Sequence, residues 1–319
     1  MKSKFEYFGF KFLGQLPKEL GSITASHLST PDLIRHSKVS KGHRAYFVPI
    51  LEERKVLQKF LHHVVRGEHD AWKEMLKKEI HLMYKKDQVT DRSGRTFSFI
   101  SAFEYALWAL DKHTWTMMLD CLPKTEEGKK VLEELIAQYD KVNMKGVTYR
   151  LNGKTTTEKH FDFNNTIIKE LRTQVDSINA DGEKDWGAID KQWREGVGGA
   201  QKRLPMHIVD EYCSNEPFYP VPKFTSQPKS SKQFYNWTTN KDEDWFSVDS
   251  KLGSEVAIYK GALAHGAAAR RRLRMWWFAG RDLDAMTALC EARTLDLINL
   301  KSQLEEQAGL ENHYQIAPM

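Results

Sequence analysis

One cysteine stands near groups that could serve as its base. Cys213 follows His207 and Glu211, and His160 and Asp162 form a second pair that could act as base and orienting group. A nucleophilic thiolate needs such a base and a lowered pKa. No cysteine-hydrolase signature surrounds Cys213, and a lone cysteine is more often a buried, unreactive thiol. A thiol-dependent hydrolase or transferase at Cys213 is therefore the second hypothesis, and the sequence favours a protein that is not an enzyme.

No metal or cofactor site is indicated by the sequence. His62, His63, His69 and His81 fall in one segment, but none forms the i, i+4 pair with an intervening Glu that marks a metallopeptidase helix. The Gly153-Lys154-Thr155 run lacks the correctly spaced upstream glycine of a phosphate-binding loop. We therefore expect no bound metal and no cofactor.

A basic and aromatic patch extends from residue 270 to residue 278. Its cations are Arg270, Arg271, Arg272 and Arg274, which adjoin Trp276 and Trp277. Such a composition is typical of contacts with anionic lipids or nucleic acids. At ~100° per residue the arginines and apolar residues interleave around a helix, whereas a membrane-surface helix separates them. The patch is a candidate anion-binding site for an anionic membrane surface, and a buried helix with paired arginines is the alternative.

Composition limits the class of protein. The chain has 319 residues, with 48 Lys and Arg against 43 Asp and Glu, and a formal charge of +5. Because this excess is small for the chain's size, no nucleic-acid partner is expected. The mean hydropathy is −0.59, and no run approaches the ~18 apolar residues that span a bilayer, which excludes a membrane-embedded protein. Three isolated cysteines predict neither a disulfide framework nor a zinc site, and fit a reducing compartment.

Hydrophobic periodicity divides the chain into three regions and predicts a mainly α fold. Residues 1–48 form an N-terminal arm, residues 49–145 a stack of amphipathic helices, and residues 146–319 a mainly helical C-terminal domain. Asn152-Gly153 predicts a small β-hairpin over residues 147–157, because this dipeptide supplies the positive φ angles of a tight turn.

Two features of the C-terminal domain bear on its packing. Residues 213–245 carry four prolines and many aromatic side chains, which predicts a long irregular crossing that is packed rather than disordered. An apolar stripe from Leu283 to Leu304, in which only Arg293 is not apolar, predicts a terminal helix packed on the protein's own core. A partner-binding or dimerising helix is the alternative.

Two segments of the helical stack share a helix–turn–helix pattern. The first, Leu61–Leu76, has its turn at Gly67, and the second extends from Asp91 to Leu119. Both resemble degenerate ankyrin repeats, with Ser101-Ala-Phe-Glu-Tyr-Ala106 in place of the family's Thr-Pro-Leu-His-x-Ala. The hydroxyl, the large apolar residue and the alanine are kept, whereas Pro and His are not. The resemblance implies ankyrin-like helix pairs in the N-terminal half.

A wider set of motifs runs through the chain. It comprises Val89–Phe97, Phe103–Asp111, Leu151–Lys154, His160–Phe163 and Leu289–Thr294, together with the glutamates before Ile316-Ala-Pro-Met319. The set is similar to that of large effectors that Legionella-type bacteria send into host cells by type IVB secretion. The resemblance implies a virulence protein, made in the bacterial cytoplasm and delivered to the host-cell cytosol.

The first functional hypothesis is therefore a translocated effector that acts as a protein-binding module for a host protein. Its binding face is expected on the inner helices and turns of residues 50–125. The candidate partner-binding residues, expected to be at least partly exposed, are Glu68, His69, Arg92, Arg95, His113 and Trp115. Membrane recruitment through the patch at residues 270–278 is the third hypothesis.

Overall fold

The structure is a computed structural model that describes residues 25, 28–236, 239–261 and 278–309. The chain divides into two compact units, Met1–Lys59 and Phe60–Met319. The described residues are mainly helical and include a small antiparallel sheet, which confirms the predicted fold class at this level. Among them, no helix is both long and apolar enough to cross a membrane.

The first unit contains α2 (Thr30–Ser37) and the larger part of α3 (Lys41–Val65). The Ser29 hydroxyl accepts a hydrogen bond from the Asp32 amide at 3.2 Å and so caps the start of α2. The small buried core of this unit is formed by Ala25, Leu33 and Phe47. Part of the predicted N-terminal arm is therefore helical.

Four strands of the second unit form one antiparallel sheet. In sheet order they are β1 (Lys86–Thr90), β2 (Thr96–Ser101), β3 (Val147–Leu151) and β4 (Lys154–Glu158). The β3–β4 hairpin lies at the predicted position. Asn152 and Gly153 at its turn have φ angles of 50° and 81°, a conformation that these two residue types tolerate well.

The β1–β2 hairpin interrupts the stack of amphipathic helices predicted for residues 49–145, so that prediction was wrong over residues 86–101. Val89 and Ile100 are buried, whereas Phe99 is 71% exposed, so apolar residues do not alternate as in a regular half-buried strand. The register shifts between Asp87 and Val89, which further obscures the period. The tight turn at residues 91–94 therefore joins two strands instead of two helices.

A fully buried helix lies at the centre of the second unit. This helix is α5 (Ala102–Ala109), and every one of its residues is buried. Ser101 and Glu104 close its N-terminus as a capping box. The helices that come before and after it along the chain are α4 (His69–Leu76), η2 (Ile80–Met83), α6 (Lys112–Asp120) and α7 (Glu126–Lys145). Because α5 packs against β2, α6 and α7, it joins the sheet to the helical layer.

Both segments that resemble ankyrin repeats contain two consecutive helices. In the first, α3 ends at Val65, the chain turns at Gly67 with φ of 62°, and α4 follows. In the second, α5 and α6 are joined at Leu110, which has φ of 58°. The β1–β2 hairpin separates these helix pairs in the sequence, so their stacking as consecutive repeats stays a prediction.

Short helices make up the first part of the C-terminal region. They are η3 (Asn164–Ile168), α8 (Lys169–Asn179), α9 (Trp186–Lys191), η4 (Gln192–Val197), α10 (Gly198–Gln201) and α11 (Met206–Tyr212). The chain then crosses irregularly, except for the paired strands β5 (Gln233–Asn236) and β6 (Lys241–Asp244). Phe218, Phe224 and Trp245 are buried along this crossing, so aromatic side chains anchor it to the core.

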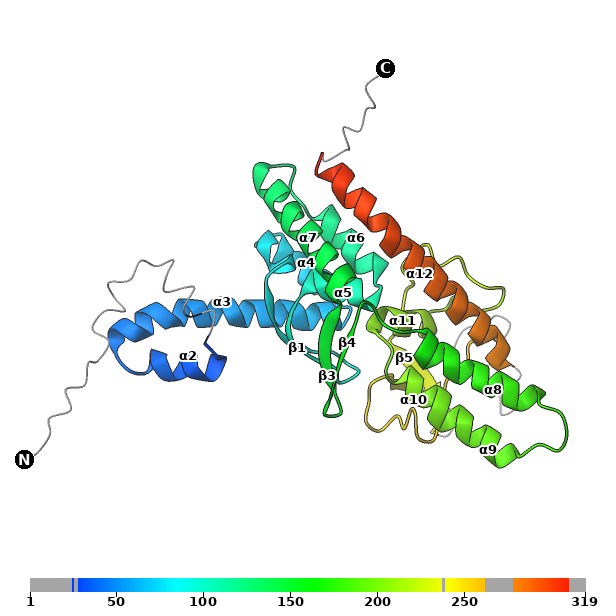
Figure 1. Ribbon diagram of the computed structural model, residues 1–319. Helices are drawn as coiled ribbons and strands as arrows, with labels where there is room; N and C mark the ends of the chain where they lie inside the picture. The colour runs from blue at the N-terminus through cyan, green and yellow to red at the C-terminus, as the bar shows by residue number, and fades with distance from the viewer. Residues whose placement is uncertain (1–24, 26–27, 237–238, 262–277, 310–319) are drawn as a thin grey trace, which may run out of the picture. The chain divides into compact units, whose positions relative to one another are not determined.

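The last described helix is α12 (Ala279–Gln307), which has 29 residues. It contacts α6, α7, η3 and α8, and Figure 1 shows it running along this series of helices. Met286, Leu289 and Leu300 are buried on its inner face. Arg293, which interrupts the apolar stripe in the sequence, is also buried there and is 1% exposed.

Two adjacent glycines in α10 give a matched test of the packing. A Cβ at Gly198 would lie 2.6 Å from the Val256 carbonyl oxygen and 3.0 Å from the Gly253 amide nitrogen, whereas a Cβ at Gly199 would meet nothing within 4 Å. We expect Gly198→Ala to lower the free energy of unfolding by about 1–3 kcal/mol, because backbone atoms must move. Gly199→Ala should raise it by about 0.4–1 kcal/mol. Urea unfolding of both variants measures the difference, and equal effects would contradict the close approach.

Candidate functional site

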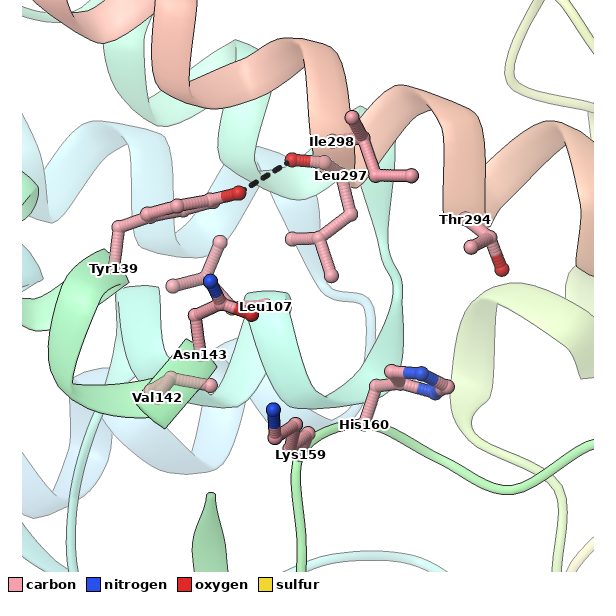
Figure 2. A pocket seen from close by; sticks show the side chains of 9 residues that line it. All are labelled: Leu107, Tyr139, Val142, Asn143, Lys159, His160, Thr294, Leu297 and Ile298. Carbon is pink, nitrogen blue, oxygen red and sulfur yellow. Dashed lines mark hydrogen bonds between the residues drawn. The ribbon is translucent and has the colours of Figure 1, made fainter. Parts of the chain in front are cut away.

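A pocket of about 140 Å³ lies between α7 and α12. We call it the α7–α12 pocket, and Figure 2 shows its lining. The lining side chains come from α5, from α7, from the segment after β4 and from α12. They are Leu107, Tyr139, Val142, Asn143, Lys159, His160, Thr294, Leu297 and Ile298.

Two contacts hold α7 against α12 beside the pocket. The Tyr139 hydroxyl donates a hydrogen bond to the Leu297 carbonyl at 3.0 Å, drawn as the dashed line in Figure 2. The Lys301 ammonium pairs with the Asp140 carboxylate at 2.9 Å. Residues of α7 that are three or four positions apart share one face, so Val142 is buried on the same side as Tyr139. The helix period thus directs this apolar face toward α12.

A glycine allows the segment after β4 to pass close to α7. Gly146 ends α7 with φ of 73°, and a Cβ there would lie 2.7 Å from the Glu158 carbonyl oxygen. The Phe161 amide then donates to the Trp108 carbonyl at 2.6 Å, which fixes the segment against α5. The close packing at Gly146 and the Phe161–Trp108 hydrogen bond lie on either side of Lys159 in the chain and hold it in the wall of the pocket. Figure 2 shows its ammonium pointing toward α7.

Three polar side chains of the lining have hydrogen-bonding capacity to spare. Within the described residues, neither the Lys159 ammonium nor the Asn143 amide makes a side-chain hydrogen bond or an ion pair, and both side chains are exposed. His160 Nδ1 lies 3.1 Å from the Phe161 carbonyl oxygen. Because a carbonyl only accepts, this contact selects the tautomer with a proton on Nδ1 and leaves Nε2 as an acceptor.

Exposed apolar side chains occur on α7 and α12 close in sequence to residues of the lining. Leu295 and Ile298 are about one turn apart on α12 and are 58% and 62% exposed. Met144, which follows Asn143 on α7, is 69% exposed. Apolar side chains gathered in solvent next to an apolar pocket are typical of surfaces that bind other molecules.

The lining combines apolar walls with a few polar side chains. Its nine residues include no carboxylate and no thiol. The Tyr139 hydroxyl donates to a backbone carbonyl, and the Thr294 hydroxyl donates to the Cys290 carbonyl at 2.8 Å. Across the part of the chain that the structure describes, no group of three or more His, Cys, Asp or Glu is arranged to hold a metal ion. The lining is therefore that of an apolar receptor with a cation in its wall.

Two of the expected partner-binding residues are not available at the surface. Arg95 and Trp115 are each 2% exposed, so the expectation that they are at least partly exposed was wrong. The Arg95 guanidinium lies 5.3 Å from the ring centre of Trp108, 5.4 Å from that of Phe161 and 5.5 Å from that of Tyr149. Cation–π attraction and burial therefore hold Arg95 inside the core.

The other four expected partner-binding residues are partly exposed but have partners within the second unit. His69 contacts the Gln227 amide at 3.0 Å, and His113 accepts from an Arg293 nitrogen at 2.9 Å. Glu68 pairs with His63, and the Arg92 guanidinium lies 5.7 Å from the centre of the Phe246 ring. None of these six residues lines the α7–α12 pocket.

The candidate catalytic residues are not brought together. Cys213 is 9% exposed, and burial raises the pKa of its thiol, which opposes the reactive thiolate. Burial lowers the pKa of His207 to about 3, and the ring nitrogens of His207 have no hydrogen-bond partner among the described residues. His160 lines the α7–α12 pocket, while Asp162 accepts from the Asn165 amide at 2.9 Å. No hydrogen bond connects these groups to the Cys213 thiol within the described structure.

Sequence reasoning missed a buried polar cluster around α11. Burial raises the pKa values of Asp210 and Glu211 on this helix to about 7 each. Lys260 donates to the Glu211 carbonyl, and burial lowers the pKa of its ammonium to about 8. Arg293 of α12 lies 3.9 Å from the Glu211 carboxylate. The sequence did carry one signal for this cluster, because Asp210 and Glu211 interrupt the largely apolar segment Met206–Tyr212.

The first turn of α12 holds the chain that precedes it. Asp282 is fully buried, and its carboxylate accepts from the Lys260 amide at 3.0 Å. Burial raises the pKa of Asp282 to about 7. The Arg281 guanidinium donates to the Gly261 carbonyl, also at 3.0 Å. The helix start is thereby tied to residues 260–261.

The predicted anion-binding residues lie outside the described residues. These are Arg270, Arg271, Arg272 and Arg274. The motif at Ile316–Met319 that resembles a translocation signal also lies outside them.

Comparisons with known proteins give one family and one relative. The family described as CBUA0006 C-terminal domain matches residues 166–304. The chain is also similar to "Uncharacterized protein CBUA0006" of Coxiella burnetii (strain RSA 493 / Nine Mile phase I), with 35% identity over 274 residues. That match covers 80% of this chain and 77% of the relative. No solved structure matches the chain significantly. The family match includes the α12 side of the α7–α12 pocket, whereas the α7 side precedes it.

Proposed function

The chain belongs to the family of the Coxiella burnetii protein CBUA0006, and we propose that it is a translocated bacterial effector that acts as a protein-binding module. In this proposal it is made in the bacterial cytoplasm and binds a host protein in the host-cell cytosol. The motifs that resemble effectors of Legionella-type bacteria support this origin. The relative comes from Coxiella, which is itself related to Legionella, and this is consistent with the same origin.

The observation that carries the binding role is the α7–α12 pocket. Leu107, Val142 and Leu297 give it apolar walls, and Ile298 of its lining is 62% exposed to solvent. A pocket flanked by exposed apolar side chains can take an anchor side chain from a partner, with surrounding contacts that exclude water. We therefore propose an interface on α7 and α12 instead of on the turns of residues 50–125.

The ankyrin-like helix pairs have a supporting role in this proposal. The second pair, α5 and α6, contributes Leu107 to the pocket and contacts both α7 and α12. We propose that this pair serves as a rigid base, because α5 is buried along its whole length. The pocket residues are thereby held on regular elements, which favours a preformed binding surface.

An aspartate on the exposed face of α12 tests the proposed interface. We expect Ile298→Asp to reduce capture of the host partner from host-cell lysate at least about tenfold, because a charge must then be buried against the partner. Ile298 is 62% exposed, so the variant should fold like the parent chain, as thermal unfolding would verify. Quantitative mass spectrometry of the captured proteins measures the change.

Val248→Asp is the matched control for this experiment. Val248 is 90% exposed, it lies in the segment after β6, and it does not line the pocket. The partner should be captured equally by this variant and by the parent chain. Equal capture by the parent chain and by Ile298→Asp would contradict the interface, and the absence of any protein enriched over a blank resin would contradict the binding module.

A further inference from the structure

We propose that the α7–α12 pocket receives one large apolar side chain from a partner segment and that the Lys159 ammonium pairs with a carboxylate next to that side chain. This inference rests on the proposed function and specifies the chemistry of the partner. The partner segment would be acidic and apolar, with Phe or Leu within one or two residues of Asp or Glu.

The size and lining of the pocket argue for a single apolar side chain. Its volume is about 140 Å³, and a cavity of about 150 Å³ with apolar walls is known to accept benzene. Leu107 and Val142 are buried in its wall, and Leu297 and Ile298 add apolar surface from α12. A phenyl or isobutyl group in the pocket would therefore displace water that makes no hydrogen bonds to these apolar side chains.

The charges around the pocket argue for a neighbouring carboxylate. Asp140 is already paired with Lys301 at 2.9 Å, and Asp296 is paired with Lys112 at 2.7 Å. The Lys159 ammonium makes no ion pair within the described residues. Among the nine lining residues only Lys159 carries a formal charge, so a ligand in the pocket meets a cation that has no counter-charge in the described part of the chain.

Spare hydrogen-bonding groups also fit a polar neighbour of the anchor. The Asn143 amide can donate to a carboxylate or to a backbone carbonyl. His160 Nε2 remains available as an acceptor, because Nδ1 carries the proton toward the Phe161 carbonyl. A peptide backbone supplies both donors and acceptors, whereas a purely apolar ligand would leave these groups without partners. The occupant inferred from this arrangement is thus a peptide segment.

Small probes can test the inference without any host protein. The full chain would be titrated with 3-phenylpropionate, 3-phenylpropionamide, 3-phenylpropylamine and propionate, and methyl NMR signals of Leu107, Val142, Leu297 and Ile298 would be followed. The four compounds separate the ring from the charge. We expect the phenyl carboxylate to bind about two- to fivefold more tightly than the amide, and the amine to bind most weakly, as one exposed ion pair allows. Propionate, which lacks the ring, should shift no methyl signal at the same concentration.

Lys159→Met is the variant that isolates the charge. It should bring the affinities for the phenyl carboxylate and the phenyl amide together, while the amide itself binds as before. Lys154→Met in the β3–β4 hairpin is the matched control, because Lys154 is also exposed and does not line the pocket. That variant should keep the preference of the parent chain.

Three results would overturn the inference. They are the absence of methyl shifts with every phenyl compound, equal binding of carboxylate and amide to the parent chain, and a carboxylate preference that survives Lys159→Met. Failure of the proposed function is a separate outcome. If the phenyl carboxylate binds as expected but Ile298→Asp leaves host-protein capture unchanged, the pocket chemistry stands and the proposed interface fails.

Discussion

Replacing Arg293 with methionine is expected to lower the free energy of unfolding by about 3–5 kcal/mol. Arg293 is 1% exposed, and one of its nitrogens donates to the Phe224 carbonyl at 2.9 Å. Another nitrogen donates to His113 at 2.9 Å, and the guanidinium pairs with Asp296 at 3.1 Å. Methionine can fill much of the same space but leaves these buried groups without their donor.

A surface ion pair between α12 and α7 provides the control for Arg293. Lys301 pairs with Asp140, and the two side chains are 44% and 39% exposed. Lys301→Met should cost about 1 kcal/mol or less, because water solvates the remaining carboxylate. Urea unfolding of both variants measures the two costs. Equal losses of stability would show that the buried contacts of Arg293 with Phe224 of the irregular crossing and with His113 of α6 do not stabilise the fold.

Replacing Arg95 with methionine is also expected to lower the free energy of unfolding by about 3–5 kcal/mol. The guanidinium lies among three aromatic rings and 3.5 Å from the Asp91 carboxylate, which is itself buried. Methionine would keep contact with the rings but would leave the Asp91 charge without a cation. Chemical denaturation measures the loss, and Arg150→Met, at an exposed arginine of β3, is the control.

The pH dependence of the Arg95→Met variant separates the charge from the packing. Burial raises the pKa of Asp91 above 3.8, and Arg95 opposes this shift. Without Arg95 the folded-state pKa rises further, so the ionised carboxylate destabilises the fold above that pKa. This penalty disappears as the pH falls below it toward the unfolded value. The cost of the substitution should therefore be smaller near about pH 4 than near about pH 8, and a cost independent of pH would show that packing alone is lost.

The sequence predicted correctly those elements whose conformation is set by residues close together in the chain. Asn152-Gly153 predicted the β3–β4 hairpin because its backbone angles are set within the dipeptide itself. The stripe from Leu283 to Leu304 predicted α12 because one helix face is buried along its length. The β1–β2 hairpin was missed because Phe99 faces solvent beside the buried Ile100, which breaks the two-residue period.

The candidate site depended on contacts that periodicity does not encode. Its lining comes from four segments between Leu107 and Ile298, which only tertiary packing brings together. His160 was singled out as a base for Cys213, but the structure places it in the α7–α12 pocket. A helix period shows which face is buried but not which partner buries it. For the same reason Arg293 looked like an interruption of the apolar stripe. In the structure its guanidinium donates to the Phe224 carbonyl of the crossing and pairs with Asp296 on α12.

The continuity of α12 couples two places that are distant along the helix. At its start, Asp282 holds the Lys260 amide, and about three turns later Thr294 and Ile298 form one wall of the pocket. An unbroken helix is stiff, so a guest that fills the preformed pocket and packs against α12 should also restrain the first turn of the helix, where Asp282 holds the Lys260 amide. Occupancy of the pocket should therefore slow amide hydrogen exchange at Lys260 and Gly261.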